Sequence, residues 1–365
     1  MAYKRFNVCY SVAEPDKLKI ELVKRYVFKN PIDCCVFRCS VNNVYLIKTE
    51  DIVYYLRIAN NGVRGLSLID YEEEANIMIS LNENGVNTAV PVRCKNGKFV
   101  WQINSPEGVR YAILFKEVKN NPSDDSIKRS NCLGKALANI HIISDNKNYK
   151  VSRVPIDFTY LIEKPLTLLE PYLKNKKPEE YIFICNSLNK LKKYITERLP
   201  AEKPYYGFCH GDVSGNVFFQ GETPTFFDFD FMGNGWRLDD ISFYIWGMEK
   251  QNPQYRESKE YNAFMDGYNA VRRLSDNEMD CINAFCAIRS IWSIGFCIMA
   301  FAKRNGLAGI EDHINYCINN FRMRYGQVFD DYLPQQPLQL FHQLSKRIAS
   351  RVHRLRRTHV YARDF

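Results

Sequence analysis

Residues 209–219 read CHGDVSGNVFF, and residues 225–230 read TFFDFD. The short segment 220–224 between them predicts a turn that joins two apolar strands into a hairpin. In such a hairpin Asp212 and Asn216 precede the first strand and Asp228 ends the second, so that three oxygen-bearing side chains converge. A carboxylate that accepts a proton, beside hard oxygen ligands for Mg²⁺, is the set of groups that phosphoryl transfer needs.

Each of the two motifs also has a structural interpretation when it stands alone. A His-Gly-Asp triplet is typical of a turn, and the acids of residues 225–230 could face outward from an edge strand. Together, however, three acids and an amide beside such apolar strands would be costly without a task. The combination therefore favours a functional site.

The N-terminal part of the chain has the composition of β-strands around one helix. Residues 41–48 and 52–58 are rich in β-branched and aromatic side chains, and residues 49–51 predict a short hairpin connection between them. Residues 71–81 change to a helical period, which Gly85 is expected to end. This order predicts a small α+β unit, completed by short strands at 90–93, 99–103 and 111–115.

Beyond residue 117 the pattern becomes mainly helical. Residues 119–125 are polar and loop-like, and helical periods follow at 130–143, 179–198 and 277–304. We therefore divide the chain into a β-rich N-terminal lobe with one helix, a hinge, and a helical C-terminal lobe that contains both motifs. The expected bounds are 1–115, 116–120 and 121–365.

The segment from His210 to Asp240 resembles the catalytic loop and metal-binding segment of the aminoglycoside phosphotransferase and choline kinase-like superfamily. Two further stretches are similar to this superfamily: LGKALANIH at residues 133–141 and GWRLDDIS at residues 235–242. The superfamily includes homoserine kinases and related small-molecule kinases, and it shares the protein-kinase fold. The resemblance implies a two-lobed α+β fold with a small antiparallel-sheet N-lobe and a larger, mainly helical C-lobe.

The resemblance also implies a role for the polar residues of the two motifs. Asp212 would be the catalytic base, Asp228 the principal Mg²⁺ ligand and Asn216 a second metal ligand. His210 and Asp240 would support the catalytic loop from within the fold. His141, in the upstream helix, is interpreted as a structural member of that helix.

One spacing departs from the superfamily pattern. The metal-binding Asn normally follows the catalytic Asp by five positions, whereas Asn216 follows Asp212 by four. A shorter loop could draw Asn216 off the metal. A tightened turn at Ser214 and Gly215 could absorb the missing residue, because glycine accepts unusual dihedral angles.

The resemblance to the superfamily also implies which residues bind the nucleotide. Arg57 stands where these kinases place the basic residue that contacts the α- and β-phosphates, and arginine can hold phosphate through two hydrogen bonds; the alternative is an outward-facing arginine on an alternating strand. Glu74 has the register of the glutamate that orients this basic residue, with Glu73 as the alternative. The other expected contacts are Ser40 and Asn43 in the turn over the phosphates, and Glu117 and Val118 in the hinge beside the purine.

These expectations define a phosphotransferase that uses ATP or GTP with Mg²⁺ and phosphorylates a hydroxyl of a small molecule. The acceptor would be an amino-alcohol, a hydroxy-amino acid, a sugar or an aminoglycoside-like antibiotic. The helices around and after residue 245 would bind it, with candidates Tyr244, Trp246, Tyr268, Arg289 and Trp292. Two alternatives stay open: a pseudokinase that binds a nucleotide or a partner without chemistry, and a protein Ser/Thr kinase.

The charge of the chain bears on the kind of acceptor. The net charge of +9 favours a neutral or anionic acceptor over a polycation. An acidic cleft for a polycation could still be formed by Glu222, Asp230, Asp239 and Glu249. The basic segment 346–357 could contact nucleic acid or a membrane, but we interpret it as a solvated terminal helix and expect neither partner.

The remaining features of the composition indicate a cytoplasmic protein. The 12 cysteines are scattered along 365 residues, which favours reduced thiols over a disulfide framework. The first ten residues lack an apolar run of signal-peptide length. The longest apolar stretch, residues 290–302, is too short to cross a bilayer and predicts a buried helix.

Overall fold

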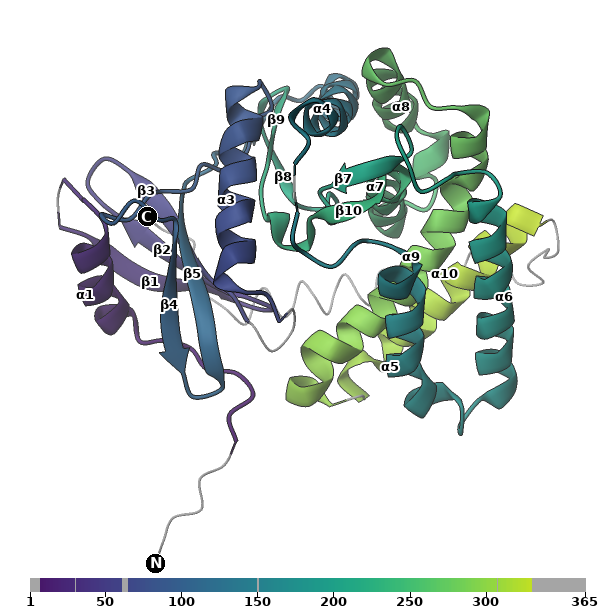
Figure 1. Ribbon diagram of the computed structural model, residues 1–365, viewed down its shortest axis with the longest axis horizontal. Helices are drawn as coiled ribbons and strands as arrows, with labels where there is room; N and C mark the ends of the chain where they lie inside the picture. The colour runs from purple at the N-terminus through teal and green to yellow at the C-terminus, as the bar shows by residue number, and fades with distance from the viewer. Residues whose placement is uncertain (1–6, 30, 61–64, 150, 307, 330–365) are drawn as a thin grey trace, which may run out of the picture.

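The computed structural model describes residues 7–29, 31–60, 65–149, 151–306 and 308–329. An N-terminal antiparallel sheet is followed by a mainly helical part, and helix α3 (Leu68–Glu83) lies between the two (Figure 1). This is the α+β, protein-kinase-like fold that the sequence predicted. The basic segment 346–357 lies outside the described residues.

Within the described residues, five strands form the N-terminal sheet in the order β1-β2-β3-β5-β4, and every neighbouring pair is antiparallel. The central strand β3 places Arg57 opposite Val44 of β2 and Ile113 of β5. The strands are β1 (Asp33–Cys39), β2 (Asn43–Lys48), β3 (Val53–Ile58), β4 (Val100–Ser105) and β5 (Gly108–Lys116).

The two faces of this sheet are covered by different helices. Helix α1 (Pro15–Arg25) buries Leu18 and Leu22 in a small core with Tyr45 and Leu56. Helix α3 belongs instead to the large core that continues into the helical part. Its N-terminus is closed by a capping box, in which Ser67 and Asp70 each bond the backbone N–H of the other.

The sequence predicted most of these elements but missed three features. Helix α1 and strand β1 were not expected. The strand expected at 90–93 was wrong: the chain runs beside β5 there but makes only an isolated bridge between Pro91 and Phe115. Two backbone hydrogen bonds flank this bridge, from Val92 N–H to the Leu114 carbonyl at 2.8 Å and from Lys116 N–H to the Val90 carbonyl at 2.9 Å, and the pairing extends no further.

The helical part is built from seven α-helices and several short strands of the described chain. The helices are α4 (Ser126–Lys147), α5 (Lys164–Leu173), α6 (Pro178–Thr196), α7 (Arg237–Gln251), α8 (Lys259–Val271), α9 (Asp276–Asn305) and α10 (Glu311–Phe329). The strands are β6 (Asn121–Pro122), β7 (Tyr206–Cys209), β8 (Val217–Gly221), β9 (Thr223–Phe226) and β10 (Gly233–Trp236). The predicted helices at 130–143, 179–198 and 277–304 correspond to α4, α6 and α9.

Helix α9 runs through the centre of the helical part and packs against α5, α7 and α10. It is the one helix of the described chain that is long and apolar enough to cross a membrane by length and composition. However, 67% of its most apolar window is buried inside the fold. Such burial is typical of the core helix of a globular domain; within the stretch 290–302 that was predicted to be buried, residues 290–295 are buried and residues 296–302 are partly exposed.

The predicted hairpin is present as β8 and β9, which pair in antiparallel register from Val217 opposite Phe226. Phe226 also exchanges two backbone hydrogen bonds with the segment after α3: Ala89 N–H donates to the Phe226 carbonyl at 2.8 Å, and Phe226 N–H donates to the Asn87 carbonyl at 2.9 Å. The hairpin therefore holds the sheet-bearing part of the chain against the helical part. Asn216 and Asp228 lie just outside its two strands.

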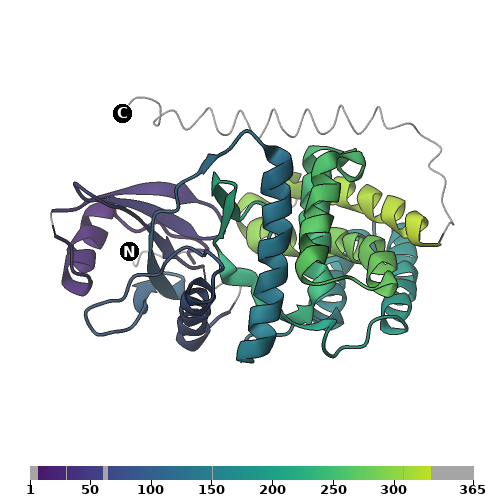
Figure 2. The same ribbon diagram turned by 90° about the horizontal axis from the view of Figure 1, so that it is seen from above.

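Helices α4 and α8 lie side by side (Figure 2) and approach each other closely at two glycines. A Cβ atom on Gly134 would lie 2.1 Å from the Phe264 carbonyl oxygen, and one on Gly267 would lie 2.1 Å from the Asn131 carbonyl oxygen. Both obstacles are backbone atoms of the facing helix. Any side chain at either position must therefore push the helices apart.

Gly134→Ala is expected to destabilise the protein by about 2 kcal/mol or more, because overpacking outweighs the roughly 1 kcal/mol that alanine gains over glycine in a helix. Urea unfolding measures the effect. The control is Lys135→Ala at the adjacent exposed position of α4, where we expect a change within about 0.5 kcal/mol. Equal stability of Gly134→Ala and wild type would contradict the close approach.

Candidate active site

The loop that carries Asp212 leaves β7 and lies against the chain before β10. Cys209 of β7 pairs with Gly233 of β10, so residues 210–212 run beside residues 229–232. Gly211 has φ of +80°, and a Cβ atom there would lie 2.2 Å from the Phe231 carbonyl oxygen. Glycine is required at this position both for its dihedral angle and for the contact.

Asp240, at the start of α7, holds this loop from beneath. Its carboxylate accepts the backbone N–H groups of His210 at 2.8 Å and Gly211 at 2.7 Å, and the Nε2 atom of His141 lies 3.2 Å away. Burial alone would raise the pKa of Asp240, but the hydrogen bond and charge of His141 lower it below its usual value. Asp240 therefore lies in the supporting position that the sequence analysis expected. His141 contacts it from within its own helix, in the structural position that was expected for that residue.

His210 joins the loop to the end of strand β9. Its Nδ1 atom lies 3.2 Å from the N–H of Asp212, so Nδ1 must accept, and Nε2 donates to the Phe227 carbonyl at 3.2 Å. Burial lowers the pKa of His210, which keeps the ring neutral, as this tautomer requires. The ring packs against Phe229 with a centroid distance of 4.2 Å. His210 thus fixes the two motifs relative to each other.

Asn216 contacts Asp212 in spite of the shortened loop. Its Nδ2 atom donates to both the carbonyl and the carboxylate Oδ2 of Asp212, each at 2.8 Å. Gly215 takes a φ of +84°, so the tightened turn expected at Ser214 and Gly215 is present. Burial and the charge of Asp228 raise the pKa of Asp212 to about 7, against the opposing effects of Arg289 and Asn216.

Asp228 follows strand β9 in a left-handed backbone conformation, with φ of 59° and ψ of 63°. Asp tolerates this region better than most residues. Its Oδ1 atom lies 3.0 Å from Nη1 of Arg57. Burial raises the pKa of Asp228 to about 6, against the opposing charge of Arg57.

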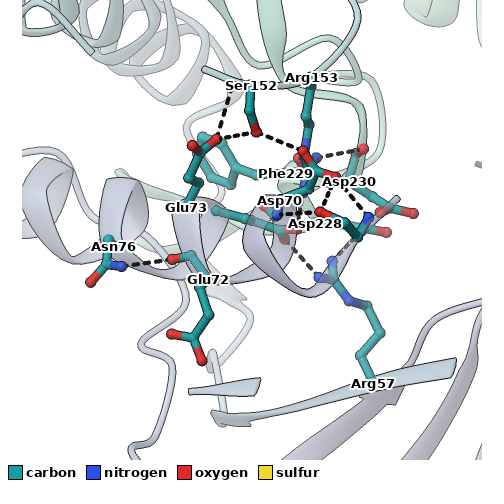
Figure 3. Close-up of polar contacts among 12 residues, drawn as sticks. Arg57, Asp70, Glu72, Glu73, Asn76, Ser152, Arg153, Asp228, Phe229 and Asp230 are labelled. Carbon is teal, nitrogen blue, oxygen red and sulfur yellow. Dashed lines mark hydrogen bonds and ion pairs between the residues drawn. The ribbon is translucent and has the colours of Figure 1, made fainter. Parts of the chain in front are cut away.

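Arg57 also pairs with Glu74 of α3, through Nη2 and Oε1 at 2.8 Å (Figure 3). Burial would lower the pKa of Arg57, but the charges of Glu74, Asp230 and Asp228 outweigh it and raise the pKa. Arg57 therefore faces inward, and the outward-facing alternative was wrong. Glu73, the alternative to Glu74, is half-buried and accepts hydrogen bonds from Ser152 instead.

A cavity of about 340 Å³ lies between the N-terminal sheet and the β8–β9 hairpin. Its apolar walls include Val44, Tyr55 and Phe115 from the sheet and Phe218 and Phe227 from the hairpin. Its polar lining includes Arg57, Asn216 and Asp228. A flat apolar slot that ends in charged groups has the chemistry of a nucleotide site.

The cavity lining differs from the sequence expectation at three residues. Val44 faces the cavity, so its neighbour Asn43 in β2 points to the opposite side of the sheet, where its side chain donates to the Ser11 carbonyl at 2.8 Å and accepts from Tyr10. Ser40 does not line the cavity; Phe37 and Arg38 of β1 do. In the hinge, Lys116 and Val118 line it, whereas Glu117 uses its N–H to bond the Val53 carbonyl at 3.0 Å.

The donor set of this cavity fits Mg²⁺. Mg²⁺ prefers oxygen ligands and is usually held by one or two carboxylates together with substrate phosphates. Asp228 offers its carboxylate. The amide nitrogen of Asn216 donates to Asp212, so the amide oxygen of Asn216 is its available ligand atom. His141, Cys209 and Asp240 also lie close together, but the Asp240 oxygens already accept the N–H groups of the catalytic loop, so we interpret that group as structural.

Two polar residues of the site were not anticipated. Asn42 donates to Oδ2 of Asp230 at 3.2 Å and so ties the β1–β2 turn to the segment 228–230. Arg153 contacts the same segment and Glu74. Neither residue belongs to a periodic pattern or a spaced motif, so no sequence signal marked them.

The expected acceptor residues take different positions. Arg289 of α9 is buried, donates to the Gly211 carbonyl and lies 3.5 Å from Asp239, so it supports the loop from below rather than facing a substrate. Tyr268 contacts His141, and Trp246 donates to Ser290. Trp292 lines a cavity of about 130 Å³ and Tyr244 one of about 440 Å³.

Comparison with known proteins identifies related chains. A model of the phosphotransferase enzyme family (APH) matches residues 40–274. An uncharacterised protein of Synechocystis sp. is 30% identical over 292 residues, which make up 79% of each chain. The family match begins after β1 and ends before α9, so it includes strands β2 to β5, the loop with Asp212 and helices α3 to α8.

Solved structures of low identity share the fold. A microcompartment-associated aminopropanol kinase superposes with a TM-score of 0.69 at 17% identity, over 88% of this chain and 99% of its own. Amicoumacin kinase in complex with AMP-PNP, Ca²⁺ and Ami superposes with a TM-score of 0.66 at 20% identity, over 85% of this chain and 93% of its own. Both alignments include the sheet and the helical part together.

Asp239 and Asp240 are adjacent buried acids whose pKa values move in opposite directions. Burial raises the pKa of Asp239 to about 6, whereas the pKa of Asp240 is lowered. The fold therefore stabilises the charge of Asp240 and disfavours that of Asp239. Asp240→Asn should destabilise the protein by about 3 kcal/mol, as loss of a buried charged partner does, and Asp239→Asn by less. Equal losses in urea unfolding would contradict this assignment.

Proposed function

Because the chain belongs to the phosphotransferase enzyme family, we propose that it transfers the γ-phosphate of ATP or GTP to a hydroxyl of a small molecule. That it is a small-molecule kinase follows from the family; the nucleotide, the residue roles and the acceptor are proposals. One observation carries them: Arg57, Asn216 and Asp228 line a single cavity, and Asn216 contacts Asp212. Side chains that could neutralise phosphate, bind a metal ion and accept a proton thus lie close together.

Each of these residues would act on a different atom of the reaction. Arg57, oriented by Glu74, neutralises the charge of the nucleotide phosphates. Asp228 and Asn216 would hold Mg²⁺, which when bound would neutralise phosphate charge. Asp212 aligns the acceptor hydroxyl and takes its proton. A base with a pKa of about 7 is well matched to proton transfer near neutral pH.

The hydrogen bond from Asn216 gives Asp212 a defined orientation. Since Nδ2 of Asn216 binds Oδ2 of Asp212, the other carboxylate oxygen is left to face the acceptor. The neutral His210 ring accepts the Asp212 N–H from the opposite side. Holding the base in one rotamer contributes to the rate by positioning the reacting groups.

The charges around the site disfavour a polycationic acceptor. Of the four acids that could have formed an acidic cleft, three are buried and paired: Asp230 with Asn42, Asp239 with Arg289, and Glu249 with Arg256. Glu222 lies 3.3 Å from Lys128. A polycationic antibiotic would therefore find few uncompensated acids, so we favour an amino-alcohol, a hydroxy-amino acid or a sugar.

The segment after Asp228 disfavours a peptide acceptor. It makes a single 3₁₀ turn at Phe229–Phe231, passes through β10 and enters α7 at Arg237. A protein Ser/Thr kinase would need a longer segment here to bind a polypeptide.

A cytoplasmic location is likewise proposed, in agreement with the 12 cysteines, which are all described and all free.

The nucleotide and Mg²⁺ together are expected to raise the melting temperature, because a ligand that binds only the folded state stabilises it, by about 2.7 kcal/mol at 100-fold excess over Kd. Asp228→Ala should abolish the part of this shift that depends on Mg²⁺. Differential scanning fluorimetry with ATP and with GTP makes the measurement. An unchanged Mg²⁺-dependent shift in the variant would mean that the metal is held elsewhere.

Asp212→Asn should lower turnover by at least about 100-fold, because the amide keeps the shape of the side chain but cannot accept the proton. Nucleotide affinity should change little, since the base acts chiefly in the transition state. The assay follows nucleotide consumption with a panel of hydroxylated metabolites and antibiotics. The control is Asp280→Asn on the exposed face of α9.

Two results would count against this role for Asp212. The variant could retain near wild-type turnover with the acceptor that the panel identifies. Alternatively, the wild type could bind the nucleotide with Mg²⁺ and yet phosphorylate no member of the panel, which would favour the pseudokinase.

A further inference from the structure

Arg153 lies in the segment between α4 and α5 and is 4% exposed. Its guanidinium group points between α3 and the metal-binding segment 228–230, and its two terminal nitrogens serve different partners (Figure 3). Burying the charge of an arginine costs free energy of folding unless its N–H groups find partners. Its position between two parts of the site suggests what the contacts do.

One nitrogen holds the backbone directly after Asp228. Nη1 donates to the Phe229 carbonyl at 2.8 Å and to the Asp230 carbonyl at 2.7 Å. These carbonyls belong to the 3₁₀ turn that Asp228 starts from its left-handed conformation. The direction of the Asp228 side chain therefore depends on where this turn is anchored.

The other nitrogen holds α3. Nη2 donates to Oε2 of Glu74 at 2.8 Å and to the Asp70 carbonyl at 3.0 Å. The same Glu74 binds Arg57 through Oε1 at 2.8 Å. One carboxylate is thus shared by two arginines, and each arginine also contacts the 228–230 segment.

Two neighbouring side chains reinforce this arrangement. Ser152 donates from its hydroxyl to Asp70 Oδ1 at 2.7 Å and to Glu73 Oε2 at 2.8 Å, so the residue before Arg153 is also fastened to α3. The ring of Tyr71 lies 5.6 Å from the guanidinium carbon of Arg153 and 5.7 Å from that of Arg57. Both distances are measured to the ring centroid, so the two guanidinium groups lie within cation–π range of the same ring.

We propose that Arg153 is a positioning residue: it sets Asp228 at a fixed place relative to the Arg57–Glu74 pair, so that the metal and phosphate groups are assembled before the nucleotide binds. The inference rests on the proposed function, since it concerns the same Mg²⁺–nucleotide site. Outer residues that orient metal ligands change metal affinity or activity by about 10- to 100-fold when they are replaced.

Arg153→Lys separates geometry from charge. Lysine keeps the positive charge next to Glu74, but its single nitrogen cannot reach the carbonyls of residues 229 and 230 and both groups on α3 at once. Arg153→Met removes the charge as well. A loss of positive charge near a cation site should by itself strengthen Mg²⁺ binding, so charge and geometry predict opposite signs for this variant.

The experiment measures the Mg²⁺ concentration that gives half of the maximal thermal shift at a fixed, saturating ATP concentration. We expect this concentration to rise about 10-fold in Arg153→Lys and in Arg153→Met. Ser152→Ala, at an exposed position, should raise it by a smaller factor and serves where the Arg153 variants fold poorly. The readout is binding and does not require turnover.

Arg324→Ala is the matched control. Arg324 is also 4% exposed and pairs with a buried carboxylate, that of Glu249, but it lies on α10 away from the site. It should lose stability without any change in the Mg²⁺ requirement. Two results would overturn the positioning role and leave the proposed function intact. One is a Mg²⁺ requirement within twofold of wild type in both Arg153→Lys and Ser152→Ala. The other is a lowered Mg²⁺ requirement in Arg153→Met. Absence of any Mg²⁺–ATP shift in the wild type would overturn both.

Discussion

The carboxylate of Glu74 is fully buried, and the arrangement of the site depends on how its charge is satisfied. An unpaired charge in such a place would cost several kcal/mol. Arg57 from β3 and Arg153 from the segment after α4 each take one of its oxygens. Both arginines also contact residues 228–230. The pairing of Glu74 therefore fixes the sheet, α3 and the segment 228–230 relative to one another.

A second buried carboxylate organises the catalytic loop in the same manner. Asp240 accepts the N–H groups of His210 and Gly211, and Arg289 donates to the carbonyl of Gly211. The loop backbone is thus held by charged side chains of α7 and α9. Asn216 then bonds Asp212 even though the loop is one residue shorter than the superfamily pattern.

The family match and the acceptor site involve different parts of the chain. The matched segment ends at residue 274, whereas α9 and α10 follow it. Trp292 of α9 lines a cavity, and Arg289 of the same helix supports the loop. The residues that we propose for phosphate, metal and proton transfer (Arg57, Asp212, Asn216 and Asp228) therefore lie within the matched segment, whereas Trp292, one of the proposed acceptor residues, lies beyond it.

The sequence by itself determined the fold class, the hairpin, most of the helices, and the identity of Asp212, Asp228, Arg57 and Glu74 as candidates. The hairpin, the helices and the pairing of Asp212 with Asp228 follow from periodicity and from motifs whose spacing is local, whereas the kinase-like fold and the candidates Arg57 and Glu74 follow from the resemblance to the superfamily. Only the tertiary structure decided that Asn43 points away from the cavity, that Arg289 is a support, and that Asn42 and Arg153 belong to the site. Their roles are pairings between residues far apart in the chain, such as Arg153 with Glu74 and Phe229, and a single sequence carries no signal for which distant partners a buried polar side chain will meet.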